Sequence, residues 1–377
     1  MAQATEIRKT ESKRMANMEG LRILAMMMVI MLHYLGKGEV LPALTGSMDV
    51  NGYAAWILET LSIVAVNVYM LISGYFLSGS GFKAGRLLQL LCQILFYSML
   101  VPVALLCLGI LKPGELTLYQ LLQYCLPTQM IHYWFATAYV VMYLFSPILN
   151  IAVKNMKKGQ LQAVILLLLV FQSLNKSLLP VRLEMDNLGY DGIWFMCVYL
   201  IAAYIRLYGI PLYTNGKRSF CLYLAGCVGI LGVTLAVRAL YFATGQFENF
   251  IGAAYHYNHI LNLFAAISLF YACYYWKLSQ GRIAGVILRI APYTFGVYLL
   301  HEHLELRYRW PQWLGVHGDG NVLMFILRSV AAVVLVFAVG IGVDLVRGLL
   351  FRAVGRFFAG GRIAAWLERL DGRIAGK

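Results

Sequence analysis

Apolar stretches of about 20 residues recur along nearly the whole chain, and they constrain its fold more than any other feature. A helix of about 20 apolar residues crosses the ~30 Å hydrocarbon layer of a membrane. Hydropathy gives candidate spans at 19–35, 54–77, 87–111, 133–153, 160–179, 189–208, 219–243, 254–276, 291–306 and 321–346. The sequence therefore predicts an all-α, polytopic membrane protein with about ten transmembrane helices.

Composition supports this prediction. Hydrophobic residues make up 61% of the chain and charged residues 13%, whereas a soluble domain carries roughly 25% charged residues. The chain therefore leaves no room for a large soluble domain. We predict a membrane domain over residues 1–346 and a basic, amphipathic cytoplasmic tail over residues 347–377, with its arginines interleaved among apolar residues on the inner leaflet.

Basic residues give the chain an orientation. The formal net charge is +14, and most Lys and Arg residues fall in loops on one side if the N-terminus is cytoplasmic. The basic start of the chain contributes Arg8, Lys9, Lys13 and Arg14. The positive-inside rule then predicts that both termini are cytoplasmic. Anionic lipid explains the basic excess, so no nucleic-acid partner is expected.

The first predicted span carries two ionisable residues, Arg22 and His33. Eleven residues of helix turn through three full turns plus about 20°, so both side chains share one face, about 16 Å apart along the axis. Arg22 is expected near the inner interface and His33 toward the outer side. An ionisable group within a span indicates function by default, although a histidine bonded to a neighbouring helix is the structural alternative.

The second predicted span carries polar groups that could face a ligand. Ser73 and Tyr75 flank Gly74 near its inner end and offer two hydroxyls where a backbone can approach closely. Small residues also pack membrane helices without any further role. Asn67 lies at mid-depth and needs a hydrogen-bond partner, which an ordinary interhelical contact would also provide.

Two clusters are expected at the outer side. Trp134 opens the fourth span beside His132, although aromatic belts are normal at that depth. His301 and Glu302 close the ninth span, where neighbouring His and Glu side chains could orient a base or bind a sugar. All seven histidines fall on or near this side, and histidine suits proton transfer near neutral pH. Their spacing does not match a metal site, so we predict no metal.

In this order, these elements resemble the acyltransferase 3 family of integral membrane acyltransferases. The matching pieces are Arg22-x10-His33, residues 72–77, residues 133–135 and residues 298–301. Residues 67–77 and 145–150 are most similar to the exopolysaccharide and capsule O-acetyltransferase branch. The resemblance covers the chain through about residue 346.

The resemblance implies transfer of an acyl group, usually acetyl from acetyl-CoA, to a carbohydrate hydroxyl. It also implies that His33 is catalytic and Arg22 essential. Expected partners are acyl-CoA as donor substrate, a glycan or lipid-linked sugar acceptor, membrane lipids, and further copies or polysaccharide-assembly proteins. The expected location is a bacterial plasma membrane. Some members carry a fused extracytoplasmic hydrolase-type domain, which is not seen after the tenth span here, so transfer is expected to finish in the membrane domain or with a separate partner.

These lines combine into one hypothesis. Coenzyme A docks at the inner face, with Arg22 and Arg86 near its phosphates and Ser73 and Tyr75 beside it. Its pantetheine arm follows the stripe toward His33, the general base. The acceptor enters from outside between Trp134, Asn67 and the His301–Glu302 pair. Direct transfer and a covalent acyl-enzyme both fit these residues.

Two other functions also fit the sequence. A secondary transporter or glycan flippase could use ten spans, outer aromatics and one intramembrane histidine, but transporters usually show paired repeats with broken helices, and no such pairing is evident. A sensor or scaffold with an inactive acyltransferase-like domain is the third possibility. The presence of both Arg22 and His33 favours the enzyme.

Overall fold

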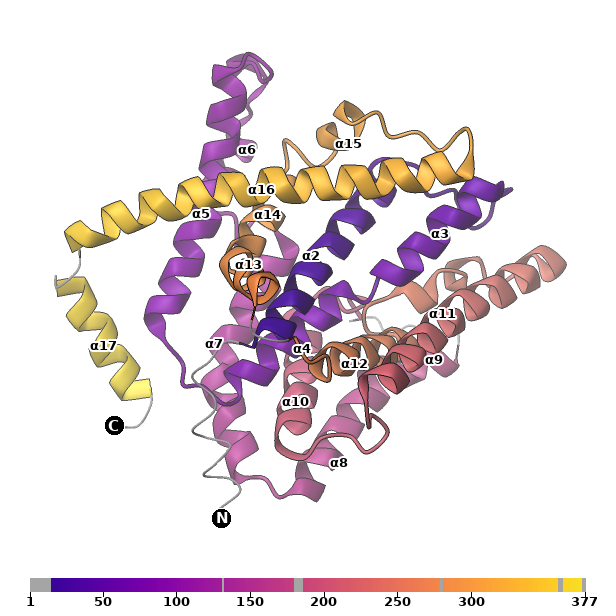
Figure 1. Cartoon of the computed structure of the whole chain (residues 1–377), viewed down its shortest axis with the longest axis horizontal. Helices are drawn as coiled ribbons and strands as arrows, with labels where there is room; N and C mark the ends of the chain where they lie inside the picture. The colour runs from indigo at the N-terminus through magenta and orange to yellow at the C-terminus, as the bar shows by residue number, and fades with distance from the viewer. Residues whose placement is uncertain (1–14, 131, 180–185, 279–280, 359–361, 375–377) are drawn as a thin grey trace.

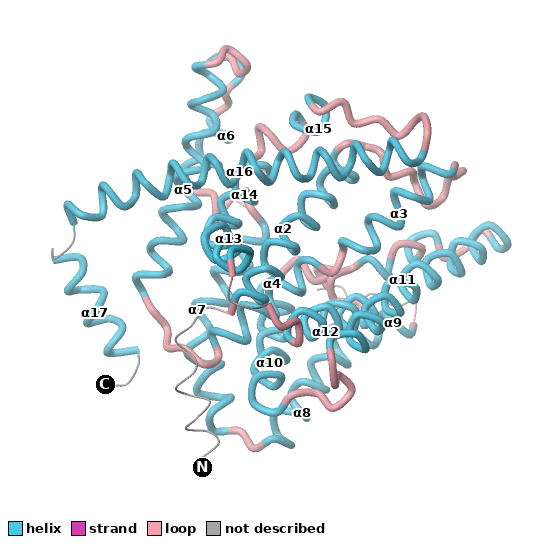
Figure 2. The backbone as a smooth tube through the Cα atoms, viewed as in Figure 1, coloured by secondary structure: helices cyan, strands magenta, loops and turns pink. Residues whose placement is uncertain are grey.

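A computed structural model describes residues 15–130, 132–179, 186–278, 281–358 and 362–374 of the chain. Within these ranges the chain is helix and loop, without a strand (Figure 2). The helices are α2 (Ala16–Lys37), α3 (Val50–Ser62), α4 (Ala65–Leu77), α5 (Ala84–Cys107), α6 (Leu118–Cys125), α7 (Trp134–Asn155), α8 (Lys158–Leu169), α9 (Asn175–Leu178), α10 (Gly192–Tyr208), α11 (Gly216–Thr244), α12 (Ile260–Tyr274), α13 (Arg282–Ile290), α14 (Thr294–His301), α15 (Arg309–Trp313), α16 (Val322–Phe358) and α17 (Arg362–Ile374).

Eight helical segments of the described chain are long and apolar enough to cross a membrane, judged by length and composition. They are Ala16–Lys37, Val50–Leu77, Ala84–Cys107, Trp134–Asn155, Lys158–Leu178, Gly216–Thr244, Arg282–His301 and Val322–Ala353. The apolar α10 and α12 are shorter, with 17 and 15 residues. The predicted all-α, polytopic membrane class is therefore confirmed. All ten predicted ranges overlap a helical segment, and the number of spans and the side of each terminus stay predictions.

α2 and α4 form the centre of the helix assembly. α2 contacts α3, α4, α12, α13, α14 and α16, and α4 is buried along most of its length. Helices at the periphery turn large apolar side chains outward instead, as Leu166 and Leu167 on α8 and Val228 on α11 show. Such a surface matches lipid, so the central stripe of α2 is enclosed by protein while the outer helices face the hydrocarbon.

The ninth, second and tenth predicted spans differ from the helices in the structure. The ninth span begins at Arg282 rather than residue 291, because the amphipathic α13 carries Arg282 and Arg289 and lacks the uniform apolarity that hydropathy detects. The second span is broken at Ile63–Val64. The last helix continues beyond residue 346 to Phe358 and crosses the molecule toward α17 (Figure 1).

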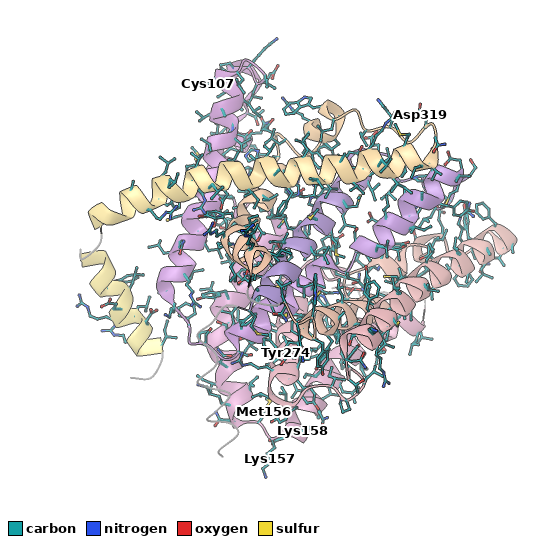
Figure 3. The ribbon with its side chains drawn as sticks, in the orientation of Figure 1. Cys107, Met156, Lys157, Lys158, Tyr274 and Asp319 are labelled. Carbon is teal, nitrogen blue, oxygen red and sulfur yellow. The ribbon has the colours of Figure 1, made fainter. Side chains whose placement is uncertain are left out.

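The ends of the helices separate into two sides. Lys157 and Lys158, between α7 and α8, lie at the opposite end of the molecule from Cys107 and Asp319 (Figure 3). This is the arrangement that the alternating loops require. Four basic residues that contribute to the predicted orientation lie outside the described residues: Arg8, Lys9, Lys13 and Arg14. Residues 359–361 and 375–377 of the predicted tail lie outside them as well. The division at residue 346 stays a prediction.

A buried ion pair within α16 is hydrogen-bonded to α5. Arg347 Nη2 donates to Asp344 Oδ2 at 2.9 Å, and Asp344 Oδ1 accepts hydrogen bonds from Tyr97 at 2.8 Å and Gln93 at 3.1 Å. Both charged side chains are buried. Arg347, the first residue of the predicted amphipathic tail, is therefore part of the protein interior. Removing one partner of a buried pair costs about 3–5 kcal/mol, because it leaves an uncompensated charge.

Candidate active site

One stripe of α2 lines two hollows in succession. Arg22 lines a hollow at one end of the stripe, and Met26, Val29 and His33 line a second hollow farther along. These positions recur at helical spacing, so they face the same way. The shared face predicted for Arg22 and His33 is present, and each residue opens onto a different hollow.

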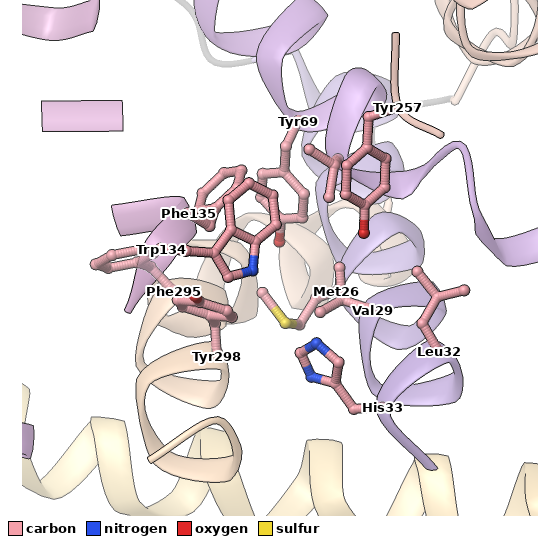
Figure 4. Close-up of a pocket in the computed structure, with 11 residues that line it drawn as sticks. Met26, Val29, Leu32, His33, Tyr69, Trp134, Phe135, Tyr257, Phe295 and Tyr298 are labelled. Carbon is pink, nitrogen blue, oxygen red and sulfur yellow. The ribbon is translucent and has the colours of Figure 1, made fainter. Parts of the chain in front are cut away.

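The second hollow, here called the outer cavity, has a volume of about 30 Å³. Met26 and His33 on α2, Trp134 on α7 and Tyr257 before α12 converge on it (Figure 4). Aromatic and aliphatic side chains form most of the wall, which is typical of a site that binds an organic ligand. The lining residues are Met26, Val29, Leu32, His33, Val66, Tyr69, Trp134, Phe135, Tyr257, Phe295 and Tyr298.

His33 and His301 meet across 268 residues of sequence, and their hydrogen bonds assign the tautomers. His301 Nδ1 lies 2.6 Å from the Val297 carbonyl oxygen, which only accepts, so His301 Nδ1 carries a hydrogen. In the neutral ring, His301 Nε2 is then an acceptor. His33 Nδ1 lies 2.9 Å from it and donates. His33 Nε2 therefore keeps its lone pair, and Figure 4 shows this nitrogen pointing into the outer cavity.

Glu302 lies beside this histidine pair and is buried. Its Oε2 is 3.2 Å from His33 Nδ1. Lys37 Nζ donates to both carboxylate oxygens, and Arg307 Nη1 is 3.6 Å from Oε1. Two cations and an imidazole N–H thus compensate one buried carboxylate, as a buried charge requires. The carboxylate can hold His33 in its orientation and stabilise the imidazolium that forms when Nε2 takes a proton.

The first hollow, here called the inner hollow, has a volume of about 260 Å³. Polar side chains from α2, α4 and α5 line it. They include Arg22, Ser73 and Arg86, which are predicted from the sequence to bind the acyl-CoA donor. Arg22 Nη1 also donates to Glu19 at 2.6 Å. The full lining is Arg22, Tyr69, Ser73, Arg86, Gln89, Leu90, Gln93, Phe135, Tyr139, Ala291, Pro292, Thr294 and Phe295.

Three aromatic residues line both hollows. Tyr69, Phe135 and Phe295 belong to the walls of the inner hollow and of the outer cavity. We call these three residues the neck. Tyr69 is fixed there by a 3.0 Å hydrogen bond from its hydroxyl to the Arg22 carbonyl oxygen. A chain-like ligand that entered beside Arg22 would have to pass the neck to reach His33.

Two residues predicted for the site lie elsewhere. Tyr75 packs against Phe270 and Tyr274, with the Arg206 guanidinium 5.3 Å from its ring centre. It lines neither hollow. Its ring lies on the other side of α4 from Ser73, because adjacent helical positions point about 100° apart and Tyr75 is two positions on.

Asn67 is completely buried in an interhelical hydrogen-bond network. It accepts from Trp194 Nε1 at 2.9 Å and donates to the Tyr257 carbonyl oxygen at 2.7 Å. It is not among the residues that line the outer cavity. Asn67 therefore has the ordinary interhelical role that the sequence also allowed. Its hydrogen bond to the Tyr257 backbone supports one wall of the cavity.

Sequence reasoning missed Lys37 and Arg307. Lys37 stands four residues after His33 on the same helix, a spacing that places both on one face and could have identified it. Arg307 has no such signal, because its position depends on how the segment after α14 folds back. Trp134, His301 and Glu302, predicted from the fourth and ninth spans, do lie at the outer cavity or in contact with His33.

His132, another outer histidine, has a structural role. His132 Nδ1 lies 3.3 Å from Ser98 Oγ, and His132 Nε2 accepts from the Leu304 backbone N–H at 3.3 Å. Burial lowers the pKa of His132 from 6.5 to about 4, although nearby hydrogen bonding and Glu302 oppose the shift. His132 therefore stays neutral near pH 7 and holds the segment after α14 against α5. Across the described ranges, no three His, Cys, Asp or Glu side chains converge as a metal-ligand set.

Comparison with known proteins gives one match. The family model described as an acyltransferase domain, Acyl_transf_3, matches residues 15–345. No curated protein and no solved structure matches the chain. The matched range begins before α2 and ends within α16, so it contains both hollows, the neck and the His33–His301–Glu302 cluster.

Proposed function

We propose, on the premise that the chain belongs to the acyltransferase 3 family, that it moves an acetyl group from cytoplasmic acetyl-CoA to a hydroxyl of an extracytoplasmic or lipid-linked glycan. Membership makes the protein a membrane acyltransferase. The donor, the acceptor and the roles of the residues are the proposal. The observation that carries it is the pair of hollows on one stripe of α2, which meet at the neck.

The donor enters the inner hollow. Arg22 and Arg86 supply positive charge for the phosphates of coenzyme A, and Ser73 adds a hydroxyl donor. Arginine suits this role because its planar guanidinium binds phosphate oxygens through two parallel hydrogen bonds. The narrow pantetheine arm extends along α2 through the neck, which brings the thioester into the outer cavity near His33.

The acceptor hydroxyl enters the outer cavity. His33 Nε2 removes its proton while the oxygen attacks the thioester carbonyl carbon. The Tyr298 hydroxyl in the cavity wall can donate a hydrogen bond to the oxyanion that develops. A C–O bond forms and the C–S bond breaks. His33 then returns the proton to the leaving thiolate, giving the O-acyl product and free coenzyme A.

Glu302 and His301 are positioning residues in this scheme. His301 accepts the Nδ1 hydrogen of His33, which keeps Nε2 free for the proton transfer, and the Glu302 carboxylate lies 3.2 Å from the same Nδ1. Lys37 and Arg307 hold the carboxylate in place. This is the arrangement of nucleophile activator and orienting acceptor that acyl-transfer catalysts use on unrelated folds.

Two hollows that meet at a neck would also suit a transporter or flippase, so the test must separate the two functions. Membranes containing the protein are supplied with acetyl-labelled acetyl-CoA and the host's extracellular glycans. Label in the glycan, with release of an equal amount of coenzyme A, supports the enzyme. Glycan export that depends on the protein while acetyl-CoA is neither bound nor consumed would replace the proposal with transport.

A further inference from the structure

Three aromatic rings extend from the outer cavity to the surface of the molecule. The Trp134 and Tyr257 rings line the cavity and stack at 5.7 Å with an interplanar angle of 20°. The Tyr190 ring lies 4.5 Å from that of Trp134 and 4.7 Å from that of Tyr257. Tyr190 itself is 45% exposed. We call Trp134, Tyr190 and Tyr257 the aromatic platform.

The segment that presents Tyr190 is held by a buried polar cluster. Asp186 is buried, and Lys176 Nζ lies 2.7 Å from its Oδ2. Asp186 Oδ1 accepts from Asn258 Nδ2 and from the Leu188 backbone N–H, each at 2.8 Å. These bonds tie the segment before α10 both to α9 and to the turn before α12. Tyr190 is therefore fixed in position, although its side chain is exposed.

The same segment also adopts an unusual backbone. Leu188 has φ +58° and Gly189 φ +85°, and a Cβ at position 189 would lie 2.8 Å from the Asn258 backbone nitrogen. The Tyr257 backbone N–H donates to the Leu188 carbonyl oxygen at 3.1 Å. A leucine in the left-handed region costs roughly 1 kcal/mol or more and persists where surrounding contacts enforce it, commonly at ligand sites.

A buried carboxyl group on α3 lies within electrostatic range of the platform. Glu59 on α3 lies near enough to Tyr190 and Tyr257 to interact with them electrostatically. Its Oε2 is buried, and no donor in the described part of the chain reaches it. A buried carboxylate oxygen without a partner is costly unless a ligand supplies the donor. A hydroxyl of a molecule on the platform can do so.

We propose that the aromatic platform is an acceptor subsite that stacks on a neutral pyranose ring and selects cyclic sugars over acyclic polyols. This inference rests on the proposed function, since it concerns the acceptor of that same cavity. The faces of aromatic rings carry partial negative charge, and the C–H face of a pyranose is weakly positive. A ring stacked there could direct a hydroxyl into the outer cavity, which Trp134 and Tyr257 line together with His33.

A quaternary ammonium group is the other ligand that aromatic rings bind. The platform suits it less well, because its three rings pack directly on one another and leave no space enclosed between them. The cations Lys37 and Arg307 beside Glu302 also oppose a positive ligand near the cavity. A flat face is offered instead, which matches a ring.

Saturation-transfer NMR on the purified full chain in lipid nanodiscs tests the subsite without any acyl transfer. The probes are methyl α-D-glucopyranoside, methyl β-D-galactopyranoside and methyl α-D-mannopyranoside, with sorbitol as acyclic comparator and choline as cationic comparator. We expect transfer to ring C–H protons of at least one pyranoside and none to sorbitol. Tyr190→Ala should weaken that affinity about threefold to tenfold, whereas Tyr190→Phe should retain it.

Matched variants separate binding from folding. Tyr190→Leu keeps apolar bulk without a ring and should behave as Tyr190→Ala does. Tyr119→Ala removes another exposed tyrosine, on α6, and should change nothing. Gly189→Ala should weaken binding by displacing Tyr190, whereas Gly245→Ala should not, because the left-handed Gly245 has open space around it.

Three results would overturn the subsite. The first is equal saturation transfer to sorbitol and to the pyranosides. The second is transfer to no pyranoside, whether or not the choline methyl protons receive it. The third is pyranoside binding that Tyr190→Ala leaves unaltered. Acetyl-CoA turnover reports on the proposed function in a separate sample. Loss of turnover with Tyr190-dependent pyranoside binding would refute the enzyme and keep the subsite, and the reverse pattern would refute the subsite alone.

Discussion

His33 Nδ1 lies 2.9 Å from His301 Nε2, and this contact decides which atom of His33 is free to act. His301 Nδ1 donates its hydrogen to the Val297 carbonyl oxygen, so the hydrogen between the two rings belongs to His33 Nδ1. The lone pair of His33 Nε2 therefore faces the cavity. A single hydrogen-bond chain from the backbone of α14 thus sets the tautomer of the proposed base on α2.

Glu302→Gln should lower kcat for acyl transfer, by up to about 100-fold, while changing the KM for acetyl-CoA little. The carboxylate lies 3.2 Å from His33 Nδ1, where it can stabilise the imidazolium, and it does not line the inner hollow. Steady-state kinetics of membrane preparations measure both constants. Glu305→Gln is the matched control, since Glu305 pairs with Tyr124 and Arg309 instead. Equal loss in both variants would contradict the assigned role.

Arg86→Ala should raise the KM for acetyl-CoA about tenfold and make the remaining affinity less sensitive to salt. The expected cause is loss of one charge-assisted contact to a phosphate, worth about 1.5–3 kcal/mol at most. Arg218→Ala removes an exposed arginine at the start of α11, away from the inner hollow, and serves as the control. An unchanged KM in Arg86→Ala would place the donor elsewhere.

Phe135→Trp should lower kcat more than it raises the KM for acetyl-CoA. Phe135 belongs to the neck, so added bulk obstructs the path of the pantetheine arm while the phosphate contacts of the inner hollow remain. Phe171→Trp, on the exposed periphery, provides the comparison. A kcat equal to that of the wild type in Phe135→Trp would show that the donor does not pass the neck.

Gly296→Ala should destabilise the protein by about 1–3 kcal/mol. An added Cβ would clash with the Asp344 carboxylate, so it would disturb both the buried Asp344–Arg347 pair and the hydrogen bonds that join Asp344 to α5. Gly232→Ala on α11 has open space and should be neutral or slightly stabilising. Thermal unfolding in detergent compares the two. Equal melting temperatures would contradict the close packing at Gly296.

Acidification should destabilise the outer side through His132. Burial lowers its pKa to about 4, whereas 6.5 is the ordinary value in the unfolded chain. Between these values the unfolded state binds more protons, so stability falls as pH drops from about 6.5 toward 4, by up to about 3 kcal/mol. His132→Gln should flatten this dependence. Melting temperatures at pH 7 and pH 4.5 test it, and identical pH profiles would refute it.

Local periodicity predicted the features that lie on one element. The Arg22–His33 stripe follows from helical geometry alone, and so does the polytopic helical class. Local periodicity could not predict contacts between elements that are distant in the sequence. The Glu302–Lys37 pair, the hydrogen bonds of Asp344 to Tyr97 and Gln93, and the position of Tyr190 depend on tertiary packing. Asn67 and Tyr75 show the converse, because polar residues in a span also pack other helices, and periodicity does not separate the two roles.

The most direct test of the central claim is acetyl transfer by His33→Ala. Membranes containing wild type, His33→Ala or His317→Ala receive acetyl-labelled acetyl-CoA and glycan acceptor, and gel filtration of each purified variant confirms its folding. We predict that His33→Ala loses transfer by about 100-fold or more, while His317→Ala, which changes an exposed loop histidine, matches the wild type. Full transfer by a folded His33→Ala protein would contradict the account.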